Sequence, residues 1–311
     1  MKGNANPIEN AKQNKSGKTP SGDNVSIIEK AAGRLDLGKR DNAFKPEITA
    51  DNSKVETVKI INKPAERATE SHTSRHTEIN LSQLHQLGMV TPGEGKTLAA
   101  EEFRIIKRPL IKNAFNQNDG THNHSNLIMV TSALPGEGKT FSAINLAMSI
   151  AMELDHTVLL VDADVARPSV LRTLGLKSEI GLIDMLLDEK LDLADVMLKT
   201  NVDTLSILPS GKGHKHATEL LASHAMNNLL DQIANRYPDR IVIFDSPPLL
   251  LTSEARVLAS QMGQIVLVVE AEKTTQNAVK EALHQLEACE NVNLIYNKAR
   301  TFPGGNYYGY Y

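Results

Sequence analysis

The feature that most constrains the fold of this chain is a glycine-rich turn between an apolar segment and a helical one. Residues 135–140 read PGEGKT, with SNLIMVTS before them and FSAINLAMSIAMEL after them. A buried strand that leads through such a turn into a helix aims backbone N–H groups and the positive end of the helix dipole at one point, where they bind phosphate. The sequence therefore predicts a phosphate-binding loop between a strand and a helix.

Each residue type in this loop has a defined task. Glycine lets the backbone approach anionic oxygens closely, the lysine supplies positive charge for the β- and γ-phosphates, and the threonine hydroxyl is the expected Mg²⁺ ligand. We therefore expect ATP and Mg²⁺ as ligands. Ala133 replaces the first glycine of the usual pattern and keeps the site uncrowded. The residues predicted to bind the nucleotide are Gly136, Glu137, Gly138, Lys139 and Thr140.

The same hexapeptide also occurs at residues 92–97. There it is preceded only by HQLGMV, which follows a polar stretch, so no buried strand is expected in front of it. Structural context, and not the string alone, confirms this motif. We interpret the copy at 135–140 as the phosphate loop and the copy at 92–97 as a chance or linker sequence.

Apolar segments of strand length alternate with helical patterns through the rest of the chain. Such strands are typical of a parallel sheet covered by helices on both faces. We expect an α/β fold, a P-loop NTPase with a mostly parallel sheet. The expected strands are 127–130, 158–161, 205–208, 241–244, 265–269 and 292–295. The expected helices are 98–115, which Pro109 should kink or interrupt, and 140–154, 170–174, 181–188, 217–236, 254–260 and 275–288.

Two further loops at predicted strand ends carry carboxylates. Asp162 and Asp164 occur in VLLVDADVARPS, with Arg167 on the same loop, and Asp245 occurs in IVIFDSPP. Open α/β sheets bind ligands at the carboxyl ends of their strands. Mg²⁺ takes only one or two carboxylates directly, which leaves a third for proton abstraction. Any one of these aspartates alone could instead cap a helix.

The two ends of the chain differ in composition from the α/β region. Residues 1–84 are rich in Asn, Lys, Ser, Thr, Glu and Pro, and such a stretch buries too little apolar surface to offset its ordering entropy. We expect this region to be mostly disordered, with a short helix at 26–37 that is either transient or a docking helix for a partner. The P-loop domain is expected over 85–303 and a flexible, tyrosine-rich tail over 304–311.

Charge and cysteine content exclude several classes of protein. The net charge of −3 provides no basic field for nucleic acid, and the single cysteine, Cys289, excludes an internal disulfide. No apolar run approaches the roughly 20 residues that span a bilayer, and the first residues lack the apolar centre of a secretory signal. We expect a cytoplasmic protein that reaches a membrane only through a partner.

The segments SALPGEGKT, LLVDADVARP and IVIFDSPP, in this order, resemble the Walker A, Walker A′ and Walker B motifs of bacterial tyrosine kinases. The likeness covers about residues 85–311. It implies an ATP-dependent autokinase of capsule or exopolysaccharide systems, in which Lys139 and Thr140 bind the phosphates and Mg²⁺.

The resemblance also assigns roles to the acidic loops. It implies that Asp162 activates the acceptor tyrosine, while Asp164 and Asp245 act on the metal. Ala166 stands where the family has its Walker A′ arginine, and the neighbouring Arg167 is the candidate to replace it.

Two more segments fit this family. The helix AEEFRIIKRP resembles the oligomerisation motif E-x-x-R-x-x-R through Glu101, Arg104 and Lys107, although an intrahelical salt-bridge ladder would give the same spacing. Four of the six tyrosines lie at the C-terminus, where the family has its autophosphorylation site; the alternative is a sticky unstructured end. The expected phosphoacceptors are Tyr307, Tyr308, Tyr310 and Tyr311.

Two alternatives share the fold: a ParA- or MinD-like ATPase switch, and a nucleotide-dependent scaffold of an export complex. Leu134 stands where the ATPases carry a signature lysine, which favours the kinase. The resemblance implies a membrane chain-length-determinant protein as activator, a ring-like homo-oligomer and a cognate tyrosine phosphatase. It also implies a location at the inner membrane through that activator.

Overall fold

The computed structural model describes residues 75–93, 97–115 and 124–300. The helix predicted at 26–37 and the tyrosines from Tyr307 to Tyr311 lie outside the described residues, as does Lys96 in the first PGEGKT copy. These predictions stay predictions.

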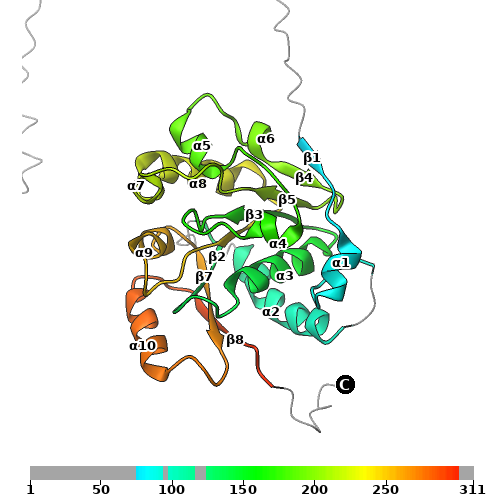
Figure 1. Cartoon of the computed structure of the whole chain (residues 1–311), viewed down its shortest axis with the longest axis vertical. Coiled ribbons are helices and arrows are strands. Elements are labelled where there is room, and N and C mark those ends of the chain that lie inside the picture. The colour runs from blue at the N-terminus through cyan, green and yellow to red at the C-terminus, as the bar shows by residue number, and fades with distance from the viewer. Residues whose placement is uncertain (1–74, 94–96, 116–123, 301–311) are drawn as a thin grey trace, which may run out of the picture. The chain divides into compact units, whose positions relative to one another are not determined.

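Eight strands form one sheet in the part of the chain that the structure describes, in the order β1-β4-β5-β3-β6-β2-β7-β8 (Figure 1). All neighbouring strands are parallel except β4 and β5, which are antiparallel. The prediction of a mostly parallel α/β sheet is confirmed. The strands are β1 (Arg75–Thr77), β2 (Leu127–Ser132), β3 (Thr157–Asp162), β4 (Leu198–Thr200), β5 (Leu205–Leu208), β6 (Arg240–Asp245), β7 (Gln264–Glu270) and β8 (Val292–Asn297).

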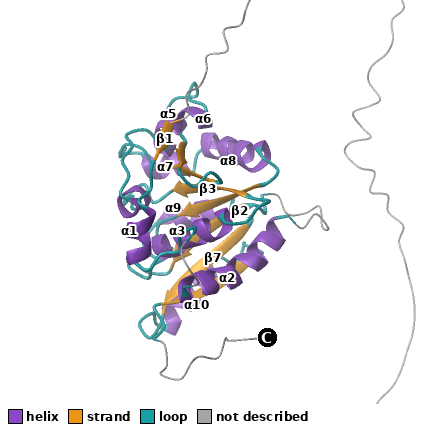
Figure 2. Cartoon of the chain, turned by 90° about the vertical axis from the view of Figure 1, so that its right-hand side faces the viewer, coloured by secondary structure: helices purple, strands orange, loops and turns teal. Residues whose placement is uncertain are grey.

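Helices cover both faces of this sheet, as the view in Figure 2 shows for the strands between α2 and α8. One face packs against α1 (Leu81–Gln86), α2 (Leu98–Ala114), α3 (Lys139–Ala151) and α4 (Val170–Leu174). The other face packs against α5 (Leu182–Leu187), α6 (Leu193–Val196), α7 (Ala217–Leu221), α8 (His224–Arg236), α9 (Ser253–Ala259) and α10 (Gln276–Gln285).

The first four residues of the central strand β2 are apolar because both faces of the strand are covered. Leu127 and Met129 point into one core, and Ile128 and Val130 point into the other, because successive side chains of a strand alternate between faces. All four are completely buried, and burying such side chains contributes about 1.5–3 kcal/mol each. The strand therefore holds the start of the glycine-rich turn firmly.

Several elements differ from the sequence-based prediction. Within the described residues, the elements β1, α1, β4 and α6 were not expected from the sequence, and β1 and α1 begin ahead of residue 85. β1 and β4 have three residues each, too few to show an alternation of apolar and polar residues. They form because they pair with each other in parallel.

Two helices also differ. The helix expected over 217–236 is divided into α7 and α8, because the Ser223 hydroxyl accepts the Met226 N–H at 3.3 Å and begins a new helix. Pro109 does not interrupt α2, which continues to Ala114. Packing of Phe103 and Leu110 in the core outweighs the hydrogen bond that proline removes.

None of the helices in the described ranges is long and apolar enough to cross a bilayer. The carboxyl ends of β3, β6 and β2 lie next to one another, and the register places Asp162 beside Asp245. The topology thus brings the three predicted loops to one edge of the sheet.

Candidate active site

The turn between β2 and α3 has the backbone conformation of a phosphate-binding loop. Gly136 and Gly138 have φ values of 85° and 100°, in the region that side chains disfavour. At Gly138 an added Cβ would also lie only 2.0 Å from Nδ2 of Asn297. The first PGEGKT copy has a different setting, since it follows α1 and its last residue, Thr97, is the N-cap of α2.

Lys139 lies at the first position of α3 and contacts the two other acidic loops. Its Nζ donates to Oδ2 of Asp164 at 2.8 Å and lies 3.9 Å from Oδ1 of Asp245. Its side chain is only 12% exposed, so this ion pair is weakly screened. The cation is held where phosphate oxygens would enter the loop.

Thr140 joins the loop to the end of β6. Its hydroxyl donates to Oδ2 of Asp245 at 2.6 Å and lies 2.8 Å from the Ser169 hydroxyl. Burial raises the pKa of Asp245 to about 6, against the lowering effect of Lys139 and of the Thr140 hydrogen bond. Oδ1 of Asp245 is buried without a hydrogen bond within the described residues.

These groups fit Mg²⁺, a cation that prefers oxygen ligands and keeps several waters. A hydroxyl and an under-bonded carboxylate lie side by side, and Asp164 is nearby. Over the described ranges, no three His, Cys, Asp or Glu side chains form a ready-made metal cluster. The arrangement therefore suits an ion whose remaining ligands come from nucleotide phosphates and water.

Asp162 is buried behind this group, with a side chain that binds the start of α4. Its Oδ2 accepts the N–H groups of Ser169 and Val170, each at 3.0 Å. Burial, and then the nearby Asp245 carboxylate, raise the pKa of Asp162 to about 7 although these two hydrogen bonds lower it. A carboxylate with a pKa near neutrality is suited to proton transfer at physiological pH.

A cavity of about 570 Å³ lies beside the loop. Asp164 and Arg167 line it on one side, and the N–H of Arg167 donates to Oδ1 of Asp164 at 3.1 Å. Pro247, Pro248 and Leu251 form an apolar wall. Asp162 is only 1% exposed and does not line this cavity.

Sequence reasoning missed four residues around the loop: Ser169, Thr274, Asn297 and Lys298. Ser169 bonds Thr140. Thr274 contacts the loop from the segment after β7, Asn297 from the end of β8 and Lys298 from just beyond it. No local pattern distinguishes them, because each is recognised only by its contact with a distant segment.

The predicted oligomerisation residues do not share one exposed face. Glu101 and Arg104 form a partly exposed pair at 2.6 Å. Lys107 is buried instead, where its Nζ donates to the Ser149 carbonyl at 2.5 Å and pairs with Glu153 at 2.6 Å. It thus ties α2 to the end of α3, where a cation also stabilises the helix dipole.

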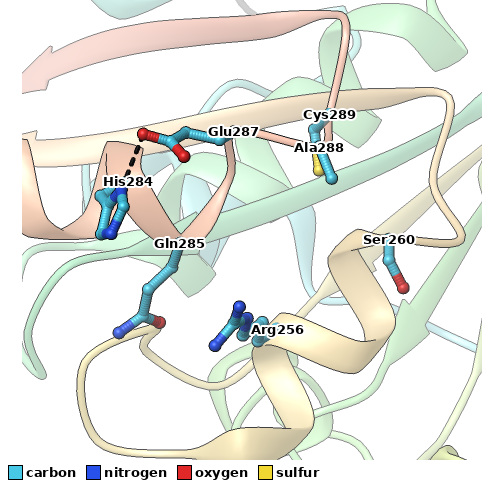
Figure 3. Close-up of a pocket in the computed structure, with 7 residues that line it drawn as sticks. All are labelled: Arg256, Ser260, His284, Gln285, Glu287, Ala288 and Cys289. Carbon is cyan, nitrogen blue, oxygen red and sulfur yellow. Dashed lines mark hydrogen bonds and ion pairs between the residues drawn. The ribbon is translucent and has the colours of Figure 1, made fainter.

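A second cavity, of about 310 Å³, lies between α9 and α10 (Figure 3). His284 pairs with Glu287 at 2.7 Å there, and the Cys289 thiol donates to the Ala259 carbonyl at 3.4 Å. Burial raises the pKa of this thiol, which disfavours the reactive thiolate. None of the predicted site residues lines this cavity.

A phosphate loop and two acidic loops at the carboxyl edge of a parallel sheet define a P-loop nucleotide-binding protein. In agreement, a family model described as an AAA domain matches residues 125–298. The chain is 31% identical to tyrosine-protein kinase YwqD of Bacillus subtilis (strain 168) over 228 residues, which is 73% of this chain and 92% of that protein.

Two further relatives agree. Tyrosine-protein kinase CpsD of Streptococcus agalactiae is 32% identical over 174 residues, covering 55% of this chain and 75% of CpsD. The solved kinase domain of the Escherichia coli tyrosine kinase ETK is 26% identical with a TM-score of 0.54, covering 73% of this chain and 98% of that domain. The chain belongs to the bacterial tyrosine kinase family and is a protein-tyrosine kinase.

Proposed function

We propose that this kinase uses ATP and Mg²⁺ to phosphorylate the C-terminal tyrosines of a neighbouring copy of itself, and so regulates polymerisation and export of a capsular or exopolysaccharide. The observation that carries the proposal is the convergence of Lys139, Thr140, Asp164 and Asp245 on one side of a phosphate loop, next to an open cavity. The family resemblance supports the choice of polymer system and of a membrane chain-length-determinant protein as activator. It also supports a cognate phosphatase that reverses the modification.

The loop residues would hold the nucleotide as follows. The Lys139 ammonium group would leave Asp164 and bind the β- and γ-phosphates. The backbone N–H groups of residues 136–140 would contact the oxygens of these phosphates. Thr140 with Asp164 and Asp245 would hold the ion, which when bound would neutralise charge on the transferred phosphoryl group. Arg167 lines the cavity and would contact the same phosphoryl oxygens.

The acceptor tyrosine would enter the cavity beside the loop. The exposed Leu251, 62% accessible, and the two prolines form a surface suited to an aromatic ring. The tyrosine oxygen attacks the γ-phosphorus while the bond to the β–γ bridging oxygen breaks, and ADP leaves with that electron pair. Asp162 would accept the phenolic proton, which requires that this buried carboxylate become accessible from the cavity when the substrates bind.

The tail has the length to reach a neighbouring site. About 14 residues separate Asn297, the last residue of β8, from Tyr311, and at roughly 3.3 Å per extended residue they span about 46 Å. Each phosphate adds about −1.5 to −2 charges. A multiply phosphorylated tail would be repelled by the carboxylate-rich site and would favour dissociation of the assembly.

Transfer between chains is tested with two variants that are each unable to label themselves. Lys139→Met protein keeps its tail but cannot use ATP, and protein lacking residues 307–311 keeps its active site but has no acceptor. Phosphotyrosine should appear on the tail of the Lys139→Met chain only when the two are mixed, as measured by phosphopeptide mass spectrometry.

Two results would contradict the proposal. Labelling of the intact protein at a rate independent of its concentration, with no label in the mixture, would show transfer within one chain. No label on any tail tyrosine, even with the cytosolic segment of the membrane activator added, would show that the tail is not the substrate.

We also propose that the outer face of α2 contacts the neighbouring copy. Leu98 and Ile105 lie on this helix 62% and 60% exposed, and Glu101 and Arg104 flank them. Large apolar side chains on a charged surface are typical of protein contacts. Lys107 supports this face indirectly, because it anchors α2 to α3.

Replacing both Glu101 and Arg104 with alanine should therefore reduce the mass in solution to that of one chain and slow tail labelling, with little change in Tm. Lys107→Ala is the contrasting variant, since it leaves the Ser149 carbonyl and Glu153 without their cation and should lower stability by about 1–3 kcal/mol. Light scattering and thermal unfolding separate the two effects. An unchanged mass for the double variant would exclude this face from the interface.

A further inference from the structure

One side of the phosphate loop is held by the last residue of β8 and by the residue that follows it. Nδ2 of Asn297 donates to the Glu137 carbonyl at 2.8 Å, and Nζ of Lys298 donates to the Gly136 carbonyl at 2.7 Å. These contacts join residues about 160 positions apart, so they are a property of the tertiary structure. The close approach of Asn297 is also what excludes a side chain at Gly138.

The side chain of Glu137, in the same loop, is also held by hydrogen bonds. Glu137 is 2% exposed, its Oε2 accepts the Leu134 N–H at 2.6 Å, and its Oε1 accepts the Thr274 hydroxyl. A buried carboxylate is retained only where its hydrogen bonds are satisfied. The Glu137 side chain is therefore bound to Leu134 and to Thr274, in the segment after β7, and is not available to the phosphates.

Because the peptide bond is planar, these contacts also fix the direction of the backbone N–H groups in the loop. In a trans peptide, the C=O of one residue and the N–H of the next point in opposite directions. The carbonyls of Gly136 and Glu137 point toward Asn297 and Lys298, so the N–H groups of Glu137 and Gly138 point away from β8. That is the inside of the loop, where phosphate oxygens bind.

We propose that Asn297 and Lys298 are positioning residues that aim the N–H groups of Glu137 and Gly138 at the phosphates of the bound nucleotide. The role rests on the proposed binding of ATP by this loop. Neither side chain needs to touch the nucleotide, because each acts through a loop carbonyl.

The backbone and charge of Lys298 support this role. Its φ of 59° is uncommon for a residue with a side chain and is typical of conformations that a functional constraint retains. Glu270 pairs with Lys298 at 3.2 Å and directs the ammonium group. Glu270 also pairs with Lys273 at 3.3 Å, and among the described residues Lys273 makes no hydrogen bond to the loop.

Lys273 therefore provides the matched control for Lys298. Both Lys298→Met and Lys273→Met remove a cation from Glu270, but only the first removes a donor to the loop. Isothermal calorimetry should show Kd values for ATP and for inorganic pyrophosphate raised about tenfold in Lys298→Met and unchanged in Lys273→Met. Lys298→Arg, which keeps a donor, should recover most of the affinity, and Tm should be unaltered because the Lys298 side chain is 46% exposed.

Asn297 is tested against Asn291, whose Nδ2 also donates to a backbone carbonyl, that of Gly263, away from the loop. Asn297→Ala should weaken binding of ATP and pyrophosphate at least fivefold, whereas Asn291→Ala should not. A loss with pyrophosphate identifies the phosphate donors as the affected groups, since this ligand has no base or ribose.

Three results would overturn the inference: unchanged affinities in Lys298→Met and Asn297→Ala, equal losses in the two lysine variants, or a parent protein that binds neither ligand. Failure of the proposed tail phosphorylation gives a different result. In that case the affinities still respond to Lys298→Met and Asn297→Ala, while no tail tyrosine is labelled.

Discussion

Lys139→Met should abolish ATP binding, whereas Lys96→Met should leave it nearly intact. Lys139 is the cation that Asp164 and Asp245 now share at the mouth of the loop. A charge-assisted hydrogen bond contributes about 1.5–3 kcal/mol, and its loss also leaves two carboxylates facing a triphosphate. We expect Kd to rise by more than about 100-fold, as measured by calorimetry or by displacement of a fluorescent nucleotide.

Lys96→Met is the control because it changes the same residue in an identical hexapeptide. The segment before that copy is a helix and not a buried strand, so the copy lacks the strand–turn–helix setting. Equal losses in both variants would show that the phosphate loop was wrongly assigned, or that neither copy acts alone. An unaltered Lys139→Met protein would exclude the loop at 135–140 altogether.

Asp162→Asn should retain ATP and Mg²⁺ affinity but lose tyrosine phosphorylation by about 100-fold or more, the usual contribution of a general base. Asp164→Asn should in addition weaken the Mg²⁺ dependence, because Asp164 contacts Lys139 and lines the cavity. Single-turnover transfer to a tail peptide, measured at several Mg²⁺ concentrations, separates the two roles. Normal transfer by Asp162→Asn with loss in Asp164→Asn would assign the base to Asp164, which already faces the cavity.

Asp162→Asn should also stabilise the nucleotide-free protein relative to the parent, but only above about pH 4. The pKa of Asp162 is raised to about 7 in the native state, so the native protein binds this proton more tightly than the unfolded chain. Stability therefore falls as pH rises from about 4 to about 7. Replacing this charge with asparagine should raise the free energy of unfolding by up to about 4 kcal/mol at pH 8 and by little at pH 4, at about 1.36 kcal/mol per pKa unit.

Thermal unfolding of parent and Asp162→Asn protein at pH 4, 6 and 8 measures this difference. Thr157→Ser, at the opposite end of β3, is the comparison variant because it keeps a hydroxyl and changes no charge. If the Tm difference between Asp162→Asn and the parent is the same at all three pH values, the raised pKa is excluded. If Asp162→Asn loses more stability with rising pH than the parent does, the pKa of Asp162 is not raised in the native state and burial is not its dominant influence.

Much of this fold could be predicted from local sequence patterns. The strands β2, β3, β6 and β7 each hold a run of at least four apolar residues and are flanked by helical patterns, so their type and their parallel pairing could be predicted. The short strands β1 and β4 could not be predicted this way, because their three residues form a strand only when the two segments meet. The division of α7 from α8 depended on one serine N-cap.

Some residues of the site could likewise be predicted from the sequence, and others could not. Gly136, Lys139, Thr140 and the three aspartates lie at strand ends, and the carboxyl ends of parallel strands meet at one edge, so their assembly was predictable from sequence. Lys107 was not, since its spacing on α2 matches an exposed motif while its side chain is buried against α3. Helical periodicity gives the spacing of a residue and not the neighbour that covers it.

The sequence by itself identified the segment that has the form of a phosphate-binding loop, because a buried strand, a glycine turn and a helix are local features. Only the tertiary structure decided how that loop is held. The choice of Asn297 and Lys298 as partners of the loop carbonyls, and the burial that raises the pKa of Asp162, arise from segments distant in the chain. Hydrogen-bond direction and desolvation depend on what surrounds a group in space, and no local pattern encodes that.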